Sequence, residues 1–329
     1  MQSQRSVDFN YLTSIGLNNP IWGVQALQMN DFVGTEWVAD WLDELWCDNY
    51  KINRKRSIKR FQKTWNGLGK AVVMVGASPA INAQIETLKG LEDDFIIVAC
   101  NTVYATLIEA GVRVDYIMAI EGRPHIASDF RLQDTHAELI VSPFVAPAVL
   151  ERWKGKVSLY HLGGGRKYAT LIKEDGILDE DIGGGNAVST ACAWAFKYLS
   201  AGDFILTGTS FCSYDQYYFD GRTTEYLCDF NTEDNIKAVD IYGKLVKVSP
   251  SQLMYKTWLE NFIKELSPKA HFVNATEDGI LGVVPKIINM DGENGQYSLV
   301  YLPWISIIPL KMAVNKYRQL FKETQHGTR

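Results

Sequence analysis

The sequence predicts an α/β fold in which helices cover both faces of a doubly wound, mostly parallel sheet. Two observations carry this prediction: short β-branched runs recur from Lys70 onward, and segments of helical periodicity separate them. Parallel strands need such crossover connections, which are right-handed and place helices on the faces of the sheet. The expected architecture is therefore Rossmann-like.

Six runs have the length and composition of buried strands. They are Ala71–Val75, Phe95–Ala99, Tyr116–Ala119, Leu139–Val141, Val157–Tyr160 and Phe204–Thr207. Four helices are expected between them, at Ala80–Gly90, Thr102–Ala110, Pro147–Trp153 and Ala187–Leu199. Gly90 and Gly111 stand where glycines commonly end helices.

The regular alternation stops after Gly208. An aromatic and polar stretch from Phe211 to Phe230 has the irregular character of a binding loop. The elements expected after it are a hairpin of Ala238–Tyr242 with Leu245–Val248, an amphipathic helix over residues 250–266 and a last helix over Leu310–Thr324.

The N-terminal region reads as a helical appendage. Trp37, Trp41 and Leu45 have helical spacing, and such a stripe favours a packing seam over a sugar-binding platform. The chain then divides into a helical appendage (1–65), an α/β catalytic domain (66–290) and a C-terminal helical tail (291–329).

Seven cations are concentrated near the end of this appendage. They are Lys51, Arg54, Lys55, Arg56, Lys59, Arg60 and Lys63. Interspersed apolar residues favour the solvated face of a helix that docks on the core. The alternative is a patch for phosphate-rich acceptors, nucleic acid or acidic lipid.

Composition narrows the functional classes. The net charge of −5 argues against a protein that grips a polyanion over a broad basic surface. The five cysteines form no C-x-x-C pair, so neither a disulfide framework nor a zinc site is indicated. No apolar run reaches membrane-spanning length, and residues 1–8 lack a signal-peptide pattern, so a cytoplasmic location is expected.

The loop after the first strand points to phosphate binding. Gly76, Ala77, Ser78 and Pro79 lead from a strand into a helix. Glycine lets the backbone approach a ligand, and the helix N-terminus offers amide hydrogens to an anion. The alternative is a tight turn in which Ser78 caps the helix. The loop has neither the Walker pattern nor the dinucleotide fingerprint.

Three more constellations follow predicted strands or open helices. Asn101 stands at a strand's carboxyl end, where open α/β sheets bind ligands, or it caps the next helix. Glu121, Arg123 and His125 combine a metal ligand, a phosphate clamp and a proton acceptor, with a surface ion pair as the alternative. A glycine run opens a helix and suits anion binding. The alternative is a flexible connection with a capping turn. The candidate residues of this run are Gly184, Gly185, Asn186 and Ser189.

The order of these pieces resembles that of the motility-associated factor (Maf) flagellin glycosyltransferase-like and 6-hydroxymethylpterin diphosphokinase MptE-like family. The matching segments are Gly76–Pro79, Val114–Tyr116 with Glu121, Gly184–Val188, Gly208–Ser210 and the intact N-A-T-E-x-G motif at Asn274–Gly279. The resemblance covers about residues 66–290 and implies a sialyltransferase-like variant of the GT-A fold.

The resemblance also implies a function. It suggests transfer of a nonulosonic-acid-type sugar from a CMP-activated donor to a hydroxyl group, with a protein, glycan or nucleic-acid acceptor. Two departures weaken a two-acid site for magnesium or manganese: Glu121 replaces the usual aspartate, and Ser210 replaces the aspartate of G-x-D. No cofactor is therefore assigned, and Glu121 is the candidate metal ligand.

The resemblance and the residue types together give a set of site residues. Those implied to hold the donor nucleotide are Gly76, Ala77, Ser78, Pro79, Asn101, Arg123, Gly184, Gly185, Asn186, Ser189, Ser210, Tyr214, Tyr217 and Tyr218. The expected mechanism is inverting displacement with His125 as the base and His161 as the alternative, because imidazole titrates near neutral pH. The rival functions are a magnesium-dependent pterin diphosphokinase and a nucleotide-binding protein without turnover.

Overall fold

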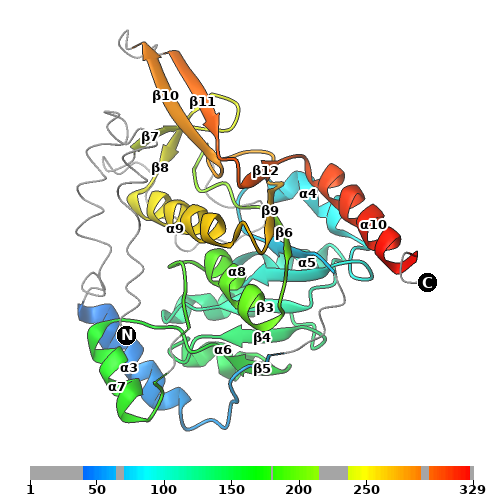
Figure 1. The fold of residues 1–329 in the computed structure, drawn as a ribbon. Helices are drawn as coiled ribbons and strands as arrows, with labels where there is room; N and C mark the ends of the chain where they lie inside the picture. Colours follow the sequence, from blue (N-terminus) through cyan, green and yellow to red (C-terminus); the bar gives the residue numbers. More distant parts are fainter. Residues whose placement is uncertain (1–39, 64–69, 179–180, 215–235, 290–295, 327–329) are drawn as a thin grey trace.

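A single parallel sheet forms the centre of the molecule. The computed structural model describes residues 40–63, 70–178, 181–214, 236–289 and 296–326. Its main sheet has eight strands in the order β12-β9-β6-β1-β2-β3-β4-β5, and each neighbouring pair is parallel (Figure 1). This confirms the predicted doubly wound α/β fold.

The six predicted strands all occur, with ends shifted by one residue at most. The sheet consists of β1 (Val72–Val75), β2 (Ile96–Cys100), β3 (Tyr116–Ala119), β4 (Glu138–Val141), β5 (Val157–Leu159), β6 (Asp203–Thr207), β9 (His271–Asn274) and β12 (Ile305–Ile307). The sequence analysis missed β9 and β12. Both are short, and β12 has only three residues, too few for a period-2 pattern.

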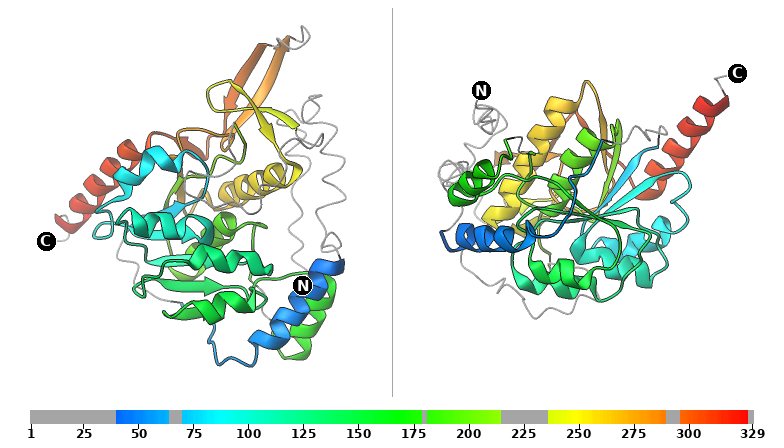
Figure 2. Two further views of the ribbon diagram at one scale, coloured as in Figure 1. Left: turned by 180° about the vertical axis from the view of Figure 1, so that it is seen from behind. Right: turned by 90° about the horizontal axis from the view of Figure 1, so that it is seen from below.

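Helices cover both faces of the sheet (Figure 2). One face carries α4 (Ile81–Leu88), α5 (Asn101–Glu109), the 3₁₀ helix η2 (Pro124–Phe130), α6 (Pro147–Arg152) and α10 (Leu310–His326). The other carries α3 (Asp40–Asn53), α7 (Arg166–Glu174), α8 (Ala187–Tyr198) and α9 (Pro250–Leu266). The sequence predicted all of these helices except η2 and α7.

Alternating side chains on each strand divide the core into two layers. On β1, Val73 and Val75 pack under α4 and α5, whereas Val72 and Met74 pack under α8. All four side chains are buried, because strands covered on both faces have no solvated side. This explains why the strands read as continuous apolar runs.

Two small hairpins form separate two-stranded sheets. They are β7 (Ile236–Val239) with β8 (Leu245–Val248), and β10 (Val283–Asn289) with β11 (Gln296–Tyr301), which projects at the top of Figure 1. The first was predicted with Ala238–Tyr242 as its first strand, but that strand begins at Ile236 and ends at Val239. Asp240 ends β7 early because its Oδ1 accepts hydrogen bonds from the backbone N–H groups of Tyr242 and Lys244.

The N-terminal helix α3 is packed onto the body of the protein. Cys47 and Tyr50 are buried in the same layer as α8, and the ring of Trp46 stacks on Phe144 with centroids 4.4 Å apart. Trp41, which was predicted to form a packing seam, is 59% exposed, and Trp37 lies outside the described residues. In the C-terminal segment 291–329, predicted to be helical, β11 and β12 precede α10.

Acids hold much of the basic stretch within the described residues. Arg54 pairs with Asp175, Arg56 with Glu151 and Arg60 with Asp181, all from other parts of the chain, and Lys51 pairs with Asp48 of the same helix. Asp181 is buried and also accepts from Lys197 and Tyr198. The stretch thus holds α3 and the following chain against the core.

Candidate functional site

The chain reverses its direction of winding between β1 and β6. From β1 the chain leads through α4 to β2 and outward to β5, and it then returns through α8 to β6 on the other side of β1. Ligands of open α/β sheets bind at this switch point, outside the carboxyl ends of the strands. The site residues below are therefore located relative to the ends of β1 and β6.

Two glycines bring the strand exits into contact. The backbone N–H of Gly76 donates to the carbonyl of Thr207 at 2.8 Å. A Cβ atom on Gly208 would lie 2.6 Å from the carbonyl oxygen of Gly76, and one on Gly76 would overlap the carbonyl of Gly208. Gly208 also has φ +64°, in the left-handed region. The floor of the crevice is thus a backbone-to-backbone contact that only glycine allows.

Ser78 projects a hydroxyl group that has no protein partner among the described residues. Its backbone N–H donates to the carbonyl of Gly208 at 3.0 Å, and its Oγ is buried without a hydrogen bond. The predicted capping role is not observed, because the N-cap of α4 is Ala80 and no side chain caps this helix. The hydroxyl therefore has no hydrogen-bonding role among the described residues.

The N-terminus of α8 presents a second such hydroxyl. Asn186 is the N-cap, and its Oδ1 accepts from the backbone N–H of Ser189 at 2.8 Å, as the capping alternative predicted. Ser189 is fully buried, yet its Oγ has no partner in the described part of the chain. Since α8 packs across β1, β2 and β3 and runs antiparallel to β6, its N-terminus lies at the carboxyl edge of the sheet.

The glycine run before α8 is fixed by packing. A Cβ on Gly184 would lie 2.5 Å from the ring of Trp258, and one on Gly185 would lie 2.6 Å from the ring of Tyr255. Gly185 also adopts φ +79°. The run is therefore a defined turn under α9 and not the flexible connection that was its alternative.

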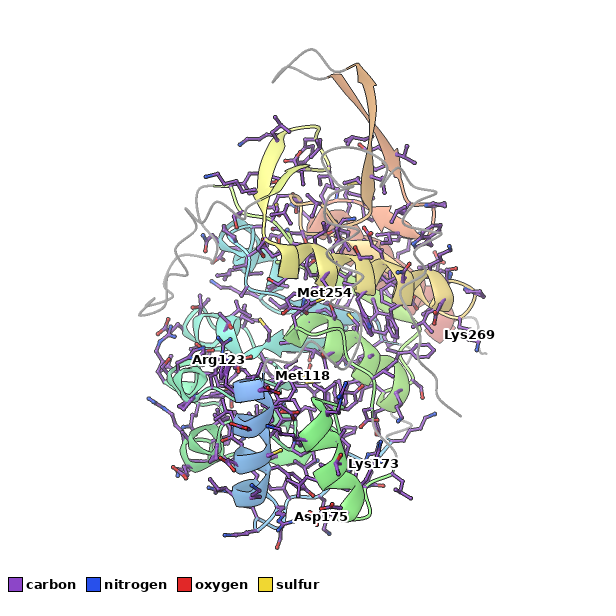
Figure 3. The ribbon with its side chains drawn as sticks, turned by 90° about the vertical axis from the view of Figure 1, so that its left-hand side faces the viewer. Met118, Arg123, Lys173, Asp175, Met254 and Lys269 are labelled. Atoms are coloured by element: carbon purple, nitrogen blue, oxygen red, sulfur yellow. The ribbon has the colours of Figure 1, made fainter. Side chains whose placement is uncertain are left out.

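Glu121 and Arg123 form a closed pair at the exit of β3. Oε1 of Glu121 accepts from the backbone N–H of Arg123 at 2.9 Å, and Oε2 accepts from its guanidinium at 2.6 Å. Burial acts to raise the pKa of Glu121, but the hydrogen bonds and charge of Arg123 outweigh it and lower the pKa. Figure 3 shows Arg123 between α3 and α9 in that view, near Met118 of β3.

This pair does not fit a divalent metal ion. Both oxygens of Glu121 are engaged by Arg123, and Ser210 supplies no carboxylate. Across the described ranges, no three His, Cys, Asp or Glu side chains come together as metal ligands would. We therefore derive no step through a metal ion.

Asn101 opens α5 and is held by an acid from η2. Its Nδ2 donates to Oδ2 of Asp129 at 2.6 Å, and both residues are buried. The N-cap of α5 is Cys100, so Asn101 does not serve as the helix cap. The pair places the amide oxygen of Asn101 at the carboxyl end of β2, next to β1.

The N-A-T-E motif ties the exit of β9 to that of β6. Asn274 Nδ2 donates to the carbonyl of Leu281, and Thr276 Oγ1 accepts from the backbone N–H of Thr209 at 3.1 Å. Glu277 is tied to α4 and α10, because its Oε1 accepts from Gln84 and from the backbone N–H of Leu310. These residues therefore have structural roles that the sequence analysis did not assign.

Ser210 and Asp278 form a pair at the end of β6. The Ser210 hydroxyl donates to Oδ1 of Asp278. Burial raises the pKa of Asp278 to about 6, because it outweighs the lowering effect of the Ser210 hydrogen bond, and repulsion from Asp240 raises the pKa further. The backbone is left-handed at Phe211, which follows Ser210, and at Glu277, which precedes Asp278, with φ +52° and +66°. Such strain is concentrated at functional sites.

We expect Asp278→Asn to stabilise the protein at neutral pH. The carboxyl has a pKa of about 6 when folded against an ordinary value of 3.8, so folding disfavours its ionised form. This loss of folding stability is absent when the pH is below the ordinary pKa and grows as the pH rises. It is complete above the pKa of the folded state, where it is on the order of 2 kcal/mol.

Thermal unfolding between pH 4 and pH 8 measures this effect. The melting temperature of Asp278→Asn should exceed that of the wild type at pH 8 and match it near pH 4. A variant that is less stable at pH 8 would show that the carboxylate contributes a stabilising contact.

The remaining predicted residues lie at different distances from the switch point. His125 begins η2 just after Glu121, whereas His161 follows β5, the outermost strand, four strands from β1. The Tyr214 hydroxyl donates to Asp240 and accepts from the backbone N–H of Gly279, so it braces the first hairpin against the Asp278 loop. Tyr217 and Tyr218 lie outside the described residues.

Comparison with known proteins identifies the family and the fold. The MAf glycosyltransferase from Magnetospirillum magneticum AMB-1 is similar in structure, with a TM-score of 0.61 and 18% sequence identity. The likeness covers 91% of this chain and 45% of the other, so this chain spans less than half the length of that protein. No curated protein matches in sequence. Within the described ranges, no helix has both the length and the apolar character needed to cross a membrane.

A family model for 6-hydroxymethylpterin diphosphokinase MptE-like proteins matches residues 45–216, which is more than half of the chain. The matched residues include the ends of β1, β2, β3 and β6 and the start of α8. The protein therefore belongs to the 6-hydroxymethylpterin diphosphokinase MptE-like family.

Proposed function

We propose that this protein is a glycosyltransferase that uses a nucleotide-activated sugar, with a CMP-nonulosonic acid as the favoured donor. The observation that carries the proposal is the pair of buried, unpartnered hydroxyls of Ser78 and Ser189 at two helix N-termini beside the switch point. The similar fold of a glycosyltransferase supports it, because that likeness covers 91% of this chain and so extends beyond the family match at residues 45–216.

The site suits a single phosphate group. A nucleoside monophosphate leaving group is anionic, and the hydroxyls of Ser78 and Ser189 would donate to its oxygens. The N-terminus of α8 adds the favourable field of its backbone dipoles. Gly76 and Gly185 fix the two loops through their close contacts with Gly208 and Tyr255, and Ala77 and Pro79 complete the first loop.

Other residues would recognise the rest of the donor. Asn101, held by Asp129, would present its amide oxygen to the base or ribose. Arg123 would face the departing phosphate while Glu121 fixes its guanidinium. In this proposal a hydroxyl acceptor attacks the anomeric carbon as the phosphate oxygen departs with the bonding electrons. The paired basic stretch favours a protein or glycan acceptor over nucleic acid.

The family description supports a second candidate, an ATP-dependent pterin diphosphokinase. That reaction handles a triphosphate and uses magnesium with carboxylate ligands. The two candidates differ in the nucleotide that they bind and in their dependence on magnesium, so one titration separates them.

Calorimetric titration with CMP, UDP-sugars, GDP-sugars and ATP, with and without magnesium, tests the proposal. We expect CMP to bind without magnesium, and Ser189→Ala and Ser78→Ala each to weaken binding by roughly 10-fold to 100-fold, since each removes a hydrogen bond to a charged group. Both variants should keep their stability in the absence of ligand, because the hydroxyl that they remove is unpartnered.

The control is Ser267→Ala at the end of α9, which removes an exposed hydroxyl bonded to the carbonyl of Lys264. It should bind CMP as the wild type does. Binding of ATP alone and only with magnesium would favour the kinase, and the absence of nucleotide binding would refute the site.

A further inference from the structure

Asp278 is an acid that the family resemblance assigns no role. It follows Glu277 in the loop after β9, and it is partly buried against β6. Ser210 fixes its Oδ1, and within the described part of the chain its Oδ2 accepts no hydrogen bond. One oxygen is thus oriented by the protein while the other is left to accept a proton.

The loop is built to aim this carboxylate. Glu277 is fixed on the α4 and α10 side by Gln84 and Leu310, and the left-handed turn at Glu277 sends the next side chain the opposite way, toward Ser210. Gly279 packs directly on the backbone of Ser210, where a side chain would overlap it. The position of Asp278 is therefore determined on both sides of the residue.

The same loop is linked to both parts of the proposed nucleotide site. Ser210 lies two residues after Gly208, whose carbonyl accepts from the backbone N–H of Ser78. On the other side, α9 packs its residues Leu253 and Met254 near Phe211 and places Tyr255 against Gly185 at the start of α8. The loop of Asp278 is therefore linked by packing to both elements that we propose to bind phosphate, the Ser78 loop and the start of α8.

We propose that Asp278 is the general base of the transfer reaction, an inference that rests on the proposed glycosyltransferase function. Its free oxygen takes the proton of the acceptor hydroxyl as the acceptor oxygen bonds to the anomeric carbon. The bond from that carbon to the phosphate breaks, and its electron pair leaves with the nucleoside monophosphate. Asp278 then releases the proton to water.

The surroundings of Asp278 suit this role. The titratable groups around it are Asp240, Cys212, Tyr214, Tyr242 and Glu277. Burial raises the pKa of Cys212 and Tyr214, so both stay neutral near pH 7, and repulsion from Asp240 supports the raised pKa of Asp278. A carboxylate that titrates near 6 is ionised at neutral pH and accepts a proton more readily than an ordinary one.

Release of CMP from CMP-N-acetylneuraminate, with water as the acceptor, provides the assay between pH 5 and pH 9. We expect the wild-type turnover number to rise through an acidic limb near pH 6. Asp278→Asn, which keeps the bond from Ser210, should lower it by roughly 100-fold or more and abolish that limb. Ser210→Ala should retain turnover and move the limb to higher pH, because it removes the hydrogen bond that lowers the pKa of Asp278.

Glu323→Gln on α10 serves as the control, and calorimetry with CMP monitors each variant. Wild-type rates and an unchanged pH profile in Asp278→Asn would overturn the inference and leave the proposed function standing. Loss of turnover in His125→Asn, with Asp278→Asn active, would assign the base to His125. Wild-type protein that binds CMP but releases none from the donor would also refute the role of Asp278, and the absence of CMP binding would refute the proposed function itself.

Discussion

Lys256→Met is expected to destabilise the protein by about 3–5 kcal/mol at neutral pH. Nζ of Lys256 lies 2.7 Å from Oε2 of Glu260, and their side chains are only 4% and 2% exposed. Oε1 of Glu260 also accepts from the backbone N–H of Gly282, so this carboxylate holds the start of β10 against α9. Without the lysine, a buried carboxylate would lose its counter-ion.

Chemical denaturation of single and double variants separates charge from packing. Lys256→Met combined with Glu260→Gln should recover most of the lost stability, because glutamine retains an acceptor for Gly282 and carries no charge. The exposed pair of Lys51 and Asp48 supplies the control, since Lys51→Met should change the free energy of unfolding very little. A double variant as unstable as the single one would attribute the loss to packing.

Gly76→Ala is expected to have the largest effect, preventing the exits of β1 and β6 from adopting their native contact. The added Cβ would overlap the carbonyl of Gly208, and this closest neighbour is backbone, so it cannot move aside as the end of a side chain could. Since Gly76 also donates to the carbonyl of Thr207, a shift large enough to relieve the overlap would break the β1–β6 pairing. The free energy of unfolding, measured by denaturation, should fall by several kcal/mol or the variant should not fold.

Gly202→Ala is the matched control for this substitution. A Cβ at Gly202 would have its closest neighbour 4.0 Å away, the carbonyl oxygen of Lys269. Its stability should therefore stay close to that of the wild type. Equal loss in both variants would mean that backbone flexibility, rather than the contact with Gly208, determines the effect.

The centre of the fold could be predicted from sequence because its strands are apolar and its helices are periodic. Tyr116–Ala119 and residues 250–266 were predicted with the bounds that the structure has. The second helix has a full capping box in Ser249 and Gln252, a strong local signal. By contrast, α7 was missed because its start is held by a distant residue, Asp43, whose carboxylate accepts from the backbone N–H groups of Lys167 and Tyr168.

The candidate site was predictable only in part, for a similar reason. The loops at Ser78 and Asn186 stand directly after or before recognisable elements, so their positions followed from the order of the strands. The pairing of Ser210 with Asp278 joins residues far apart in the chain, and the missed strand β9 is what brings them together. An acid just after an intact N-A-T-E motif was the available signal. Likewise, the basic stretch could not be interpreted until its partners in α6 and the segment after α7 were known.

The hydrogen bond between Glu277 and the backbone N–H of Leu310 bears on the order in which the protein is made. During synthesis, β1 to β5 and the loop of Ser78 leave the ribosome well before α10 does. The turn that aims Asp278 therefore lacks one of its anchors until more than thirty further residues have emerged. Both loops that we propose to bind phosphate are thus synthesised before the last anchor of the proposed base, so the position of Asp278 is among the last features of the site to be fixed.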